Sequence, residues 1–286
     1  MSVYLQPQPD DLVMRDSGEW ARAKLDYLRR YMEIFEISMK GKWPERNYVD
    51  LQAGPGKNVI RATGEVLLGS PLIALTCQPP FTGYYFVEND AECANALQKR
   101  CETSTNWNSV TIINGDCNVE VNAVVSHIRR KSPNSLNLAF LDPEGLELRW
   151  STVVALASLN KMDMVINYPQ MALTRVMPVN FGSDADGAVD QYFGTRQWRD
   201  IFREHQAKGK VGLHRDLIDL YRSKLHELGY KEVKRDDELG DEPLMRNART
   251  SAPLYRLIFA SKHPLGQDFW RKITKRDAYG QAGLFS

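Results

Sequence analysis

Short runs of apolar residues recur along the first two thirds of the chain, each followed by a segment of different periodicity. The runs are Tyr48 to Leu51, Tyr84 to Val87, Val110 to Ile113, Leu136 to Leu141 and Met162 to Ile166. They are short and continuously apolar, as expected of parallel strands that are covered on both faces. The pattern therefore predicts five parallel strands joined by helices.

The segments between these runs carry helix signals. Helices are expected from about Asp90 to Arg100 and from Val119 to Arg130. A short helix is expected to begin at Ser70-Pro71, because serine is a good N-cap and proline suits the first helical turn. Residues 57–69 are expected to form a long loop.

The first 46 residues are expected to form an extended arm and a long helix ahead of the first strand. Pro7 and Pro9 mark the arm, and Asp16 followed by Glu19 resembles a capping box. Apolar residues then recur at helical spacing, which predicts a helix with one buried face. These residues are Trp20, Leu25, Leu28, Met32, Phe35 and Met39.

The alternation breaks after Pro169. Residues 170–212 carry polar loops, many charges and a short helical segment, and we interpret them as an insertion over the acceptor side of the sheet. A helix around Leu217 to Leu228 follows, with Gly229 as its C-cap. Two further strands, near Tyr230 to Val233 and at Tyr255 to Phe259, are expected to complete the sheet.

These elements predict a single α/β domain over residues 1–286, with a mostly parallel, doubly wound sheet. Five strand–helix units followed by a final strand pair match the Rossmann-like class I methyltransferase order, although the pattern alone does not separate it from other Rossmann-like folds. Apolar residues make up 43% of the 286-residue chain, which allows one sizeable core.

Composition narrows the function classes further. The net charge of +1 argues against a strongly basic nucleic-acid binder but leaves local patches open. The N-terminus has no basic and apolar leader pattern, and no apolar run approaches the roughly 18 residues of a membrane span. The cysteines form no CxxC pair and no cluster with histidine, so no metal site is predicted. A reduced, cytoplasmic protein without a membrane partner is expected.

The strongest local signal is a glycine-containing turn, Ala53-Gly54-Pro55-Gly56, directly after the first strand. It is called the glycine turn below. A dinucleotide site would have GxGxxG leading straight into a helix, whereas Lys57-Asn58-Val59 follow here. A ligand with an amino-acid end, such as S-adenosylmethionine, fits better, because Asp50 can hold an ammonium group. A tight turn without a ligand is the alternative. The residues assigned to this end of the cofactor are Asp50, Gln52, Ala53, Gly54 and Gly56.

Two more acids stand at strand ends, where such sheets bind ligands. Glu88 follows the second strand and can accept both ribose hydroxyls of an adenosine. Asp116 follows the third strand and can accept from the adenine amino group, with Cys117 bordering the same site. A single acid would be read as a solvated loop residue or helix cap, but three in succession favour cofactor binding.

The end of the fourth strand reads Asp142-Pro143-Glu144-Gly145, where methyltransferases place residues that meet the methyl group and the acceptor. Amino methyltransferases acting on bases have a second proline and an aromatic residue where Glu144-Gly145 stand, so base methylation is in doubt. Asp142 can contact the cofactor and orient the acceptor or accept its proton, and Glu144 is a second candidate base. Alternatively, Asp142 caps the following helix.

The chain resembles the three-Cys-motif partner family of bacterial and phage proteins over almost its whole length. The resemblance rests on Trp20, Lys24 and Tyr31, on Tyr48 to Gly56, on Gly69 to Leu72, on Asp142 to Gly145 and on Leu257 to His263. Members of this family more often have phenylalanine where Gln52 and Glu144 stand here. The resemblance implies a methyltransferase fold, a Lys24 side chain that reaches the cofactor carboxylate, and a partner with a three-cysteine cluster of the radical S-adenosylmethionine kind encoded nearby. Without the resemblance, Lys24 would be interpreted as a solvated lysine on the surface of its helix.

Two functions remain open from the sequence. The first is an S-adenosylmethionine-dependent methyltransferase, with nucleic acid as the favoured acceptor class. The second is a non-catalytic binding module that docks and regulates the partner enzyme. Cations mixed with aromatic residues at Arg196 to Lys210 and Phe269 to Arg276 suit nucleic-acid contacts, but ordinary amphipathic helices are the preferred interpretation.

Overall fold

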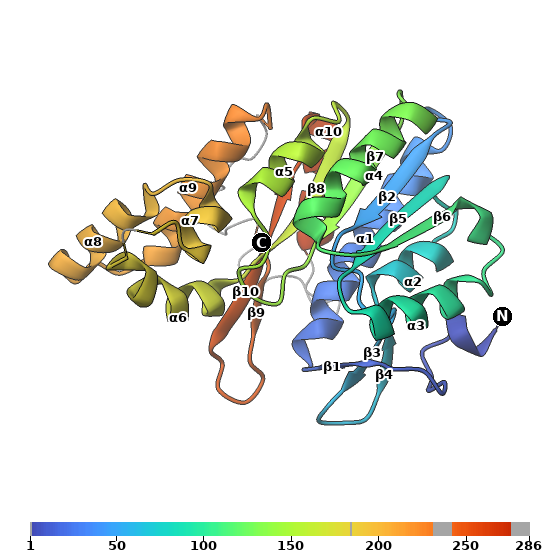
Figure 1. The fold of residues 1–286 in the computed structure, drawn as a ribbon, viewed down its shortest axis with the longest axis horizontal. Coiled ribbons are helices and arrows are strands. Elements are labelled where there is room, and N and C mark those ends of the chain that lie inside the picture. The colour runs from blue at the N-terminus through green and yellow to red at the C-terminus, as the bar shows by residue number, and fades with distance from the viewer. Residues whose placement is uncertain (1, 184, 231–241, 276–286) are drawn as a thin grey trace.

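A seven-stranded sheet forms the centre of the computed structural model, which describes residues 2–183, 185–230 and 242–275 (Figure 1). The strand order is β6-β5-β2-β7-β8-β10-β9. The first five are parallel, and β10 runs antiparallel to both of its neighbours. This order, with an antiparallel strand beside β8, confirms the predicted class I methyltransferase fold. The strands are β2 (Arg46–Asp50), β5 (Gly83–Glu88), β6 (Val110–Asn114), β7 (Leu136–Leu141), β8 (Met162–Tyr168), β9 (Leu244–Arg246) and β10 (Pro253–Ala260).

Alternating strand residues build two cores, one on each face of the sheet. Tyr48 and Phe86 point into one core, and Val49 and Val87 point into the other. Successive side chains of a strand point to opposite faces, so a strand covered on both sides is apolar throughout. This is why the predicted strands were visible as unbroken apolar runs.

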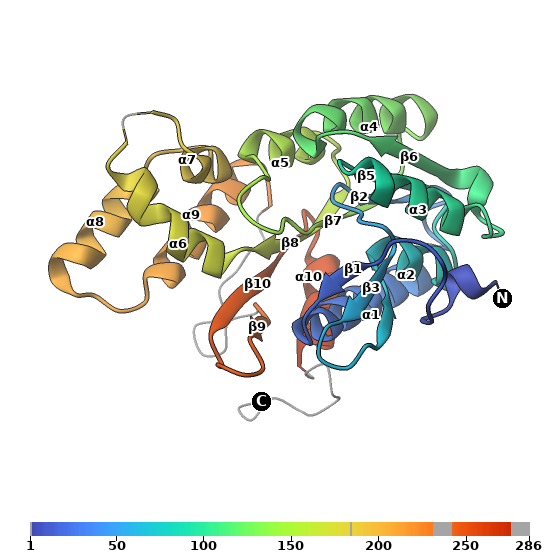
Figure 2. The ribbon, with the colours of Figure 1, turned by 60° about the horizontal axis from the view of Figure 1, so that its bottom comes forward.

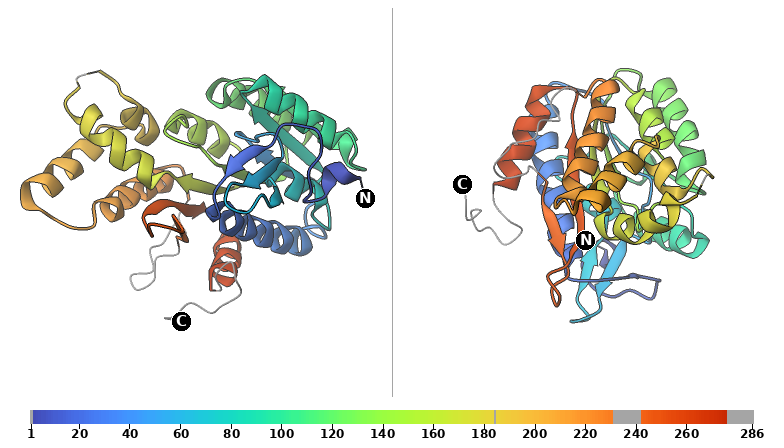
Figure 3. Two further views of the ribbon diagram at one scale, coloured as in Figure 1. Left: turned by 90° about the horizontal axis from the view of Figure 1, so that it is seen from below. Right: turned by 90° about the vertical axis from the view of Figure 1, so that its left-hand side faces the viewer.

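Helices cover both faces (Figure 3, left). The face of Tyr48 carries α1 (Trp20–Met39), α2 (Ser70–Thr76), α3 (Ala91–Cys101) and α10 (Pro264–Thr274). The face of Val49 carries α4 (Cys117–Lys131), α5 (Trp150–Ala157) and α9 (Leu213–Glu227). The predicted helices are confirmed, and Gly229 follows α9 with a φ of 90°, as its C-cap role requires.

The N-terminal arm and the segment after the glycine turn form a second, small sheet, which corrects two predictions (Figure 2). After the 3-10 turn η1 (Val3–Leu5), β1 (Arg15–Ser17) pairs in parallel with β3 (Lys57–Ile60), and β3 pairs with β4 (Val66–Leu68). The predicted loop at 57–69 is therefore wrong. The predicted capping box is also wrong, because Asp16 lies in a strand and α1 begins without a side-chain cap.

A buried ion-pair cluster fastens the arm to the domain. Asp10 lies 2.7 Å from Nζ of Lys57 and 2.5 Å from Nη2 of Arg100, and all three side chains are at most 1% exposed. Arg100 also donates to the carbonyl oxygen of Pro55 in the glycine turn, at 2.5 Å. The arm and the turn are thus held by the same guanidinium group.

The described part of residues 170–212 contains three helices that lie beside α9, at the end of the molecule away from the N-terminus (Figure 1). Trp198 and Phe202 are buried in the core, as are Phe269 and Trp270 of α10. These rings are therefore covered by protein, in agreement with the interpretation as amphipathic helices. The three helices are α6 (Gln170–Phe181), α7 (Ala188–Phe193) and α8 (Trp198–Lys208).

The strand predicted near Tyr230 to Val233 lies outside the described residues, apart from Tyr230 itself. In the described part, β9 takes the edge position next to β10. None of the described helices is both long enough and apolar enough to cross a bilayer.

Candidate functional site

The glycine turn after β2 needs its glycines for different reasons. Gly54 has a φ of 64° and Gly56 a φ of 90°, which side chains rarely allow. A Cβ on Gly56 would also lie 3.0 Å from Leu97 and 3.2 Å from Leu72. The turn therefore presents backbone without a side chain at Gly54, and it packs tightly against α2 and α3 at Gly56.

Glu88, at the end of β5, is held by two backbone donors. Its Oε2 accepts from the Gly54 amide at 2.7 Å, and its Oε1 accepts from the Asp90 amide at 2.9 Å. The residue is 5% exposed and lines the cleft. Each carboxylate oxygen retains a second lone pair. Glu88 therefore presents a fixed and largely buried hydrogen-bond acceptor to the cavity.

Asp116 and Cys117 stand at the start of α4, next to Glu88. Asp116 caps the helix by accepting from the Asn118 amide at 2.8 Å. Cys117 Sγ accepts from Nε2 of Gln52 at 3.3 Å. Burial raises the pKa of the Cys117 thiol to about 12, which makes it a poor nucleophile at neutral pH.

Asp50 lies behind the turn and forms no part of the cleft wall. It is fully buried, and its carboxylate accepts from the Tyr48 hydroxyl at 3.2 Å and from the Gln52 amide at 3.4 Å. Burial raises the pKa of Asp50 to about 7. The structure thus gives Asp50 a role in supporting the turn, and its contact with an ammonium group stays a prediction.

Asp142, at the end of β7, is clamped from two sides. Nζ of Lys24 lies 2.5 Å from its Oδ2, and Nδ2 of Asn167 donates to its Oδ1 at 2.8 Å. Its own amide donates to Oε1 of Gln52 at 3.2 Å. The alternative of a helix cap is wrong, because the next helix, α5, begins only at Trp150. The Lys24 side chain is 12% exposed and does not point freely into solvent.

The side chain of Asn167, which contacts Asp142, has an oxygen without a hydrogen-bond partner. Its Oδ1 is buried and has no hydrogen-bond partner among the described residues, while its Nδ2 is committed to Asp142. A buried polar atom without a partner is costly, so the site is suited to a molecule that brings an N–H or O–H donor.

The predicted residues border two adjoining cavities of about 410 and 390 Å³. The first contains Glu88, Asp116 and Cys117, and the second contains Ala53, Gly54, Gly56 and Asp142. Both share Arg15, Gln52 and Glu144, so they form two halves of one cleft along the carboxyl ends of the parallel strands. Of the residues assigned to the site, Asp50 alone stands outside its walls.

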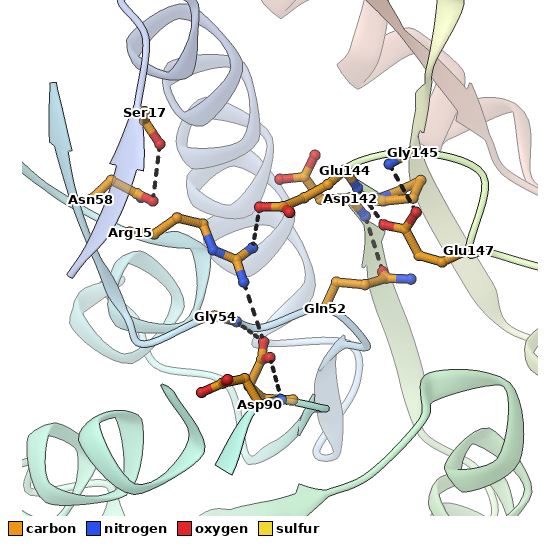
Figure 4. A network of polar contacts seen from close by, with 12 residues as sticks. Arg15, Ser17, Gln52, Gly54, Asn58, Asp90, Asp142, Glu144, Gly145 and Glu147 are labelled. Carbon is orange, nitrogen blue, oxygen red and sulfur yellow. Dashed lines mark hydrogen bonds and ion pairs between the residues drawn. The ribbon is translucent and has the colours of Figure 1, made fainter. Parts of the chain in front are cut away.

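Arg15 lies where the two halves meet, and sequence reasoning missed it. Its guanidinium points from β1 toward Glu144, at 3.2 Å (Figure 4). The same guanidinium lies 3.8 Å from the Glu88 carboxylate. Burial alone would lower the pKa of Arg15, but the charges of Glu144 and Glu88 outweigh this and raise it. No periodicity or motif marks a three-residue strand in an N-terminal arm, so Arg15 could not be predicted as a site residue from the sequence.

The second half of the cleft has aromatic walls. Trp20 and Tyr255 meet edge to face at 6.4 Å, and Nζ of Lys24 lies 5.4 Å from the Tyr255 ring centre. Met171, in the segment predicted as an insertion, lines this half, and Gln191 lines the other. The predicted position of residues 170–212 over the acceptor remains a prediction.

A separate cavity of about 420 Å³ lies at the opposite ends of β7 and β8. Its walls are largely apolar, and burial raises the pKa of Asp163 there to about 6. None of the strand-end acids lies near it, so the chemistry predicted from the sequence belongs to the cleft at the carboxyl ends.

Comparison with known proteins gives distant structural similarity alone. No family model and no curated protein matches the sequence. The chain is similar to the human methyltransferase 10 domain containing protein, at 12% identity over 55% of this chain and 70% of that chain, with a TM-score of 0.34. It is also similar to a geranyl diphosphate methyltransferase, at 10% identity over 82% and 85%, with a TM-score of 0.33. Protein LPL1258 from Legionella pneumophila is 13% identical over 57% and 74%, with a TM-score of 0.39. At these scores, the strand order carries the fold assignment.

Proposed function

We propose that this chain is an S-adenosylmethionine-dependent methyltransferase. The observation that carries the proposal is Glu88, a nearly buried carboxylate fixed by backbone donors beside a glycine turn at the carboxyl end of a central parallel strand. Glu88 would accept the ribose hydroxyls, Asp116 the adenine amino group, and the turn at Gly54 would leave room for the amino-acid part. The cofactor supplies an electrophilic methyl group on its sulfonium centre.

The second half of the cleft, which contains Asp142 and Asn167, favours an acceptor molecule with an N–H or O–H donor. Asn167 would accept from that donor through its unmet Oδ1, and Asp142 would orient the acceptor or take a proton from it. Glu144, whose side chain is 72% exposed, is a second candidate base. A nucleic acid remains the favoured acceptor class, and the edge-to-face walls Trp20 and Tyr255 are suited to a flat ring.

A non-catalytic binding module is the second candidate, and one observation favours it. Both oxygens of Asp142 already have partners, Lys24 and Asn167, so this carboxylate is not free to act as a base without losing a contact. The resemblance to the three-Cys-motif partner family supplies the proposed partner, a neighbouring protein with a three-cysteine cluster. In that case the cleft would hold the cofactor while the chain regulates the partner.

Two measurements test these proposals. Calorimetry with S-adenosylmethionine and S-adenosylhomocysteine tests cofactor binding, and binding of neither compound would contradict the first proposal. Transfer of a labelled methyl group to nucleic acid, with and without the neighbouring gene's product, then separates the two functions. Cofactor binding without transfer under either condition would favour the binding module.

A further inference from the structure

We propose, building on the proposed function, that Arg15 binds the carboxylate of the cofactor's amino-acid part and thereby selects S-adenosylmethionine over adenosines that lack this group. Arg15 is one of the three residues that both halves of the cleft share, and no role was predicted for it from the sequence.

The fold fixes Arg15 over the glycine turn. Asp10 anchors the arm to Lys57 and Arg100, and β1 pairs with β3 so that Arg15 stands opposite Asn58. A Cβ built on Gly54 would lie 3.6 Å from Cζ of Arg15. The guanidinium therefore sits in van der Waals range of the place where the turn leaves room for a ligand.

The donors of Arg15 are not used up within the protein. Its contacts with Glu144 and Glu88 are ion pairs at 3.2 and 3.8 Å, and no hydrogen bond between described residues uses its guanidinium. The Glu144 side chain is 72% exposed, so solvent screens that pair and a ligand can replace it. A planar guanidinium with free donors matches a carboxylate in two-pronged geometry.

The other cations that line the cleft are less suitable. Lys24 is tied to Asp142 at 2.5 Å, although the family resemblance suggested it for the carboxylate. Arg61 is paired with Asp16 at 3.5 Å and is 68% exposed, and Arg149 lies at the far end beside Asn118. The remaining charges of the wall are acids, which repel a carboxylate. Arg15 is thus the cation that can neutralise this group beside Gly54.

A four-way binding comparison tests the inference. S-adenosylmethionine and decarboxylated S-adenosylmethionine differ by the carboxylate alone and are titrated calorimetrically into wild type and Arg15→Gln. We expect Arg15→Gln to weaken binding of S-adenosylmethionine about 10- to 100-fold, in the range of a hydrogen bond to a charged group, and to change binding of the decarboxylated compound less than about threefold. Retained binding of the decarboxylated compound also shows that the variant is folded.

Two further variants separate the charge of Arg15 from its geometry and control for the loss of a nearby charge. Arg15→Lys keeps the charge without the two-pronged geometry, and we expect an intermediate loss. Arg61→Gln removes an equal charge directly after β3 of the small sheet, and we expect it to leave the preference between the two compounds unchanged. Equal losses for both compounds in Arg15→Gln, or no loss for either, would overturn the inference while the proposed function stands. A wild-type protein that binds neither compound would overturn the proposed function and this inference with it.

Discussion

Lys24 and Asp142 form a close ion pair, with Nζ 2.5 Å from Oδ2, that joins α1 to the end of β7 across the second half of the cleft. Asn167 holds the other oxygen of the same carboxylate from β8. Three elements thus fix the orientation of Asp142 before any ligand arrives. A carboxylate held in this way is better placed to orient an acceptor than one that rotates freely.

The first prediction concerns this carboxylate. If the chain is an enzyme, Asp142→Asn should lower turnover about 10²- to 10⁴-fold, because the amide cannot take a proton and loses the ion pair with Lys24. Cofactor affinity should change much less. Steady-state methyl transfer and calorimetry measure the two quantities, and Glu144→Gln serves as the comparison in the neighbouring candidate base. Near-normal turnover in Asp142→Asn would rule out its catalytic role.

The second prediction concerns Glu88. Glu88→Ala should weaken S-adenosylmethionine binding by roughly 1.5–3 kcal/mol, because it removes a charged acceptor that the fold has already desolvated. Adenosine should lose affinity as well, since the ribose is common to both. Isothermal titration checks this, with Glu92→Ala in the exposed first turn of α3 as a control that should bind normally. Unchanged affinity in Glu88→Ala would contradict the assignment.

The third prediction concerns the turn itself. Gly56→Ala should destabilise the domain by more than Gly64→Ala, although both glycines have a positive φ. The backbone strain of roughly 1–2 kcal/mol is common to both, whereas the new Cβ meets Leu97 and Leu72 at Gly56 alone. Urea unfolding measures the difference. Equal losses in the two variants would show that α2 and α3 relax around the added methyl group.

The fourth prediction concerns the buried cluster at Asp10. Asp10→Ala should lower the free energy of unfolding by about 3–5 kcal/mol, because Lys57 and Arg100 would remain buried without their counter-charge. It should also weaken ligand binding, since the arm that carries Arg15 loses its anchor.

The same cluster predicts a pH dependence of stability. Burial acts to raise the pKa of Asp10, but hydrogen bonds from Arg100 and Lys57 outweigh it and hold the pKa below the ordinary value of 3.8. The stabilisation is therefore complete above that value and is lost as the pH falls through the lower folded-state pKa. Urea unfolding between about pH 6 and pH 2 should show this loss in wild type. A wild-type curve that matches Asp10→Ala throughout would contradict it.

Most of the sheet could be predicted because its strands are buried on both faces. Leu136–Leu141 matches the predicted run at both ends, and the other parallel strands differ from theirs by one or two residues at one or both ends. The acids at Glu88, Asp116 and Asp142 could be predicted as neighbours because parallel strands end at the same edge of a sheet. The small sheet was missed, since β1 and β4 are three residues each and carry no clear alternation.

The parallel strands, the helices between them and the set of acids at the cleft could be predicted from the sequence, because apolar periodicity and strand ends are local properties. Which cations contact those acids depends on long-range packing and could not be predicted from the sequence. Lys24 and Asp142 are 118 residues apart in the chain, and their contact depends on how α1 packs against the sheet. Arg15 reaches the cleft because Asp10 is buried against Lys57 and Arg100. These ion pairs join residues that are far apart in the chain, so they produce no periodic pattern in the sequence.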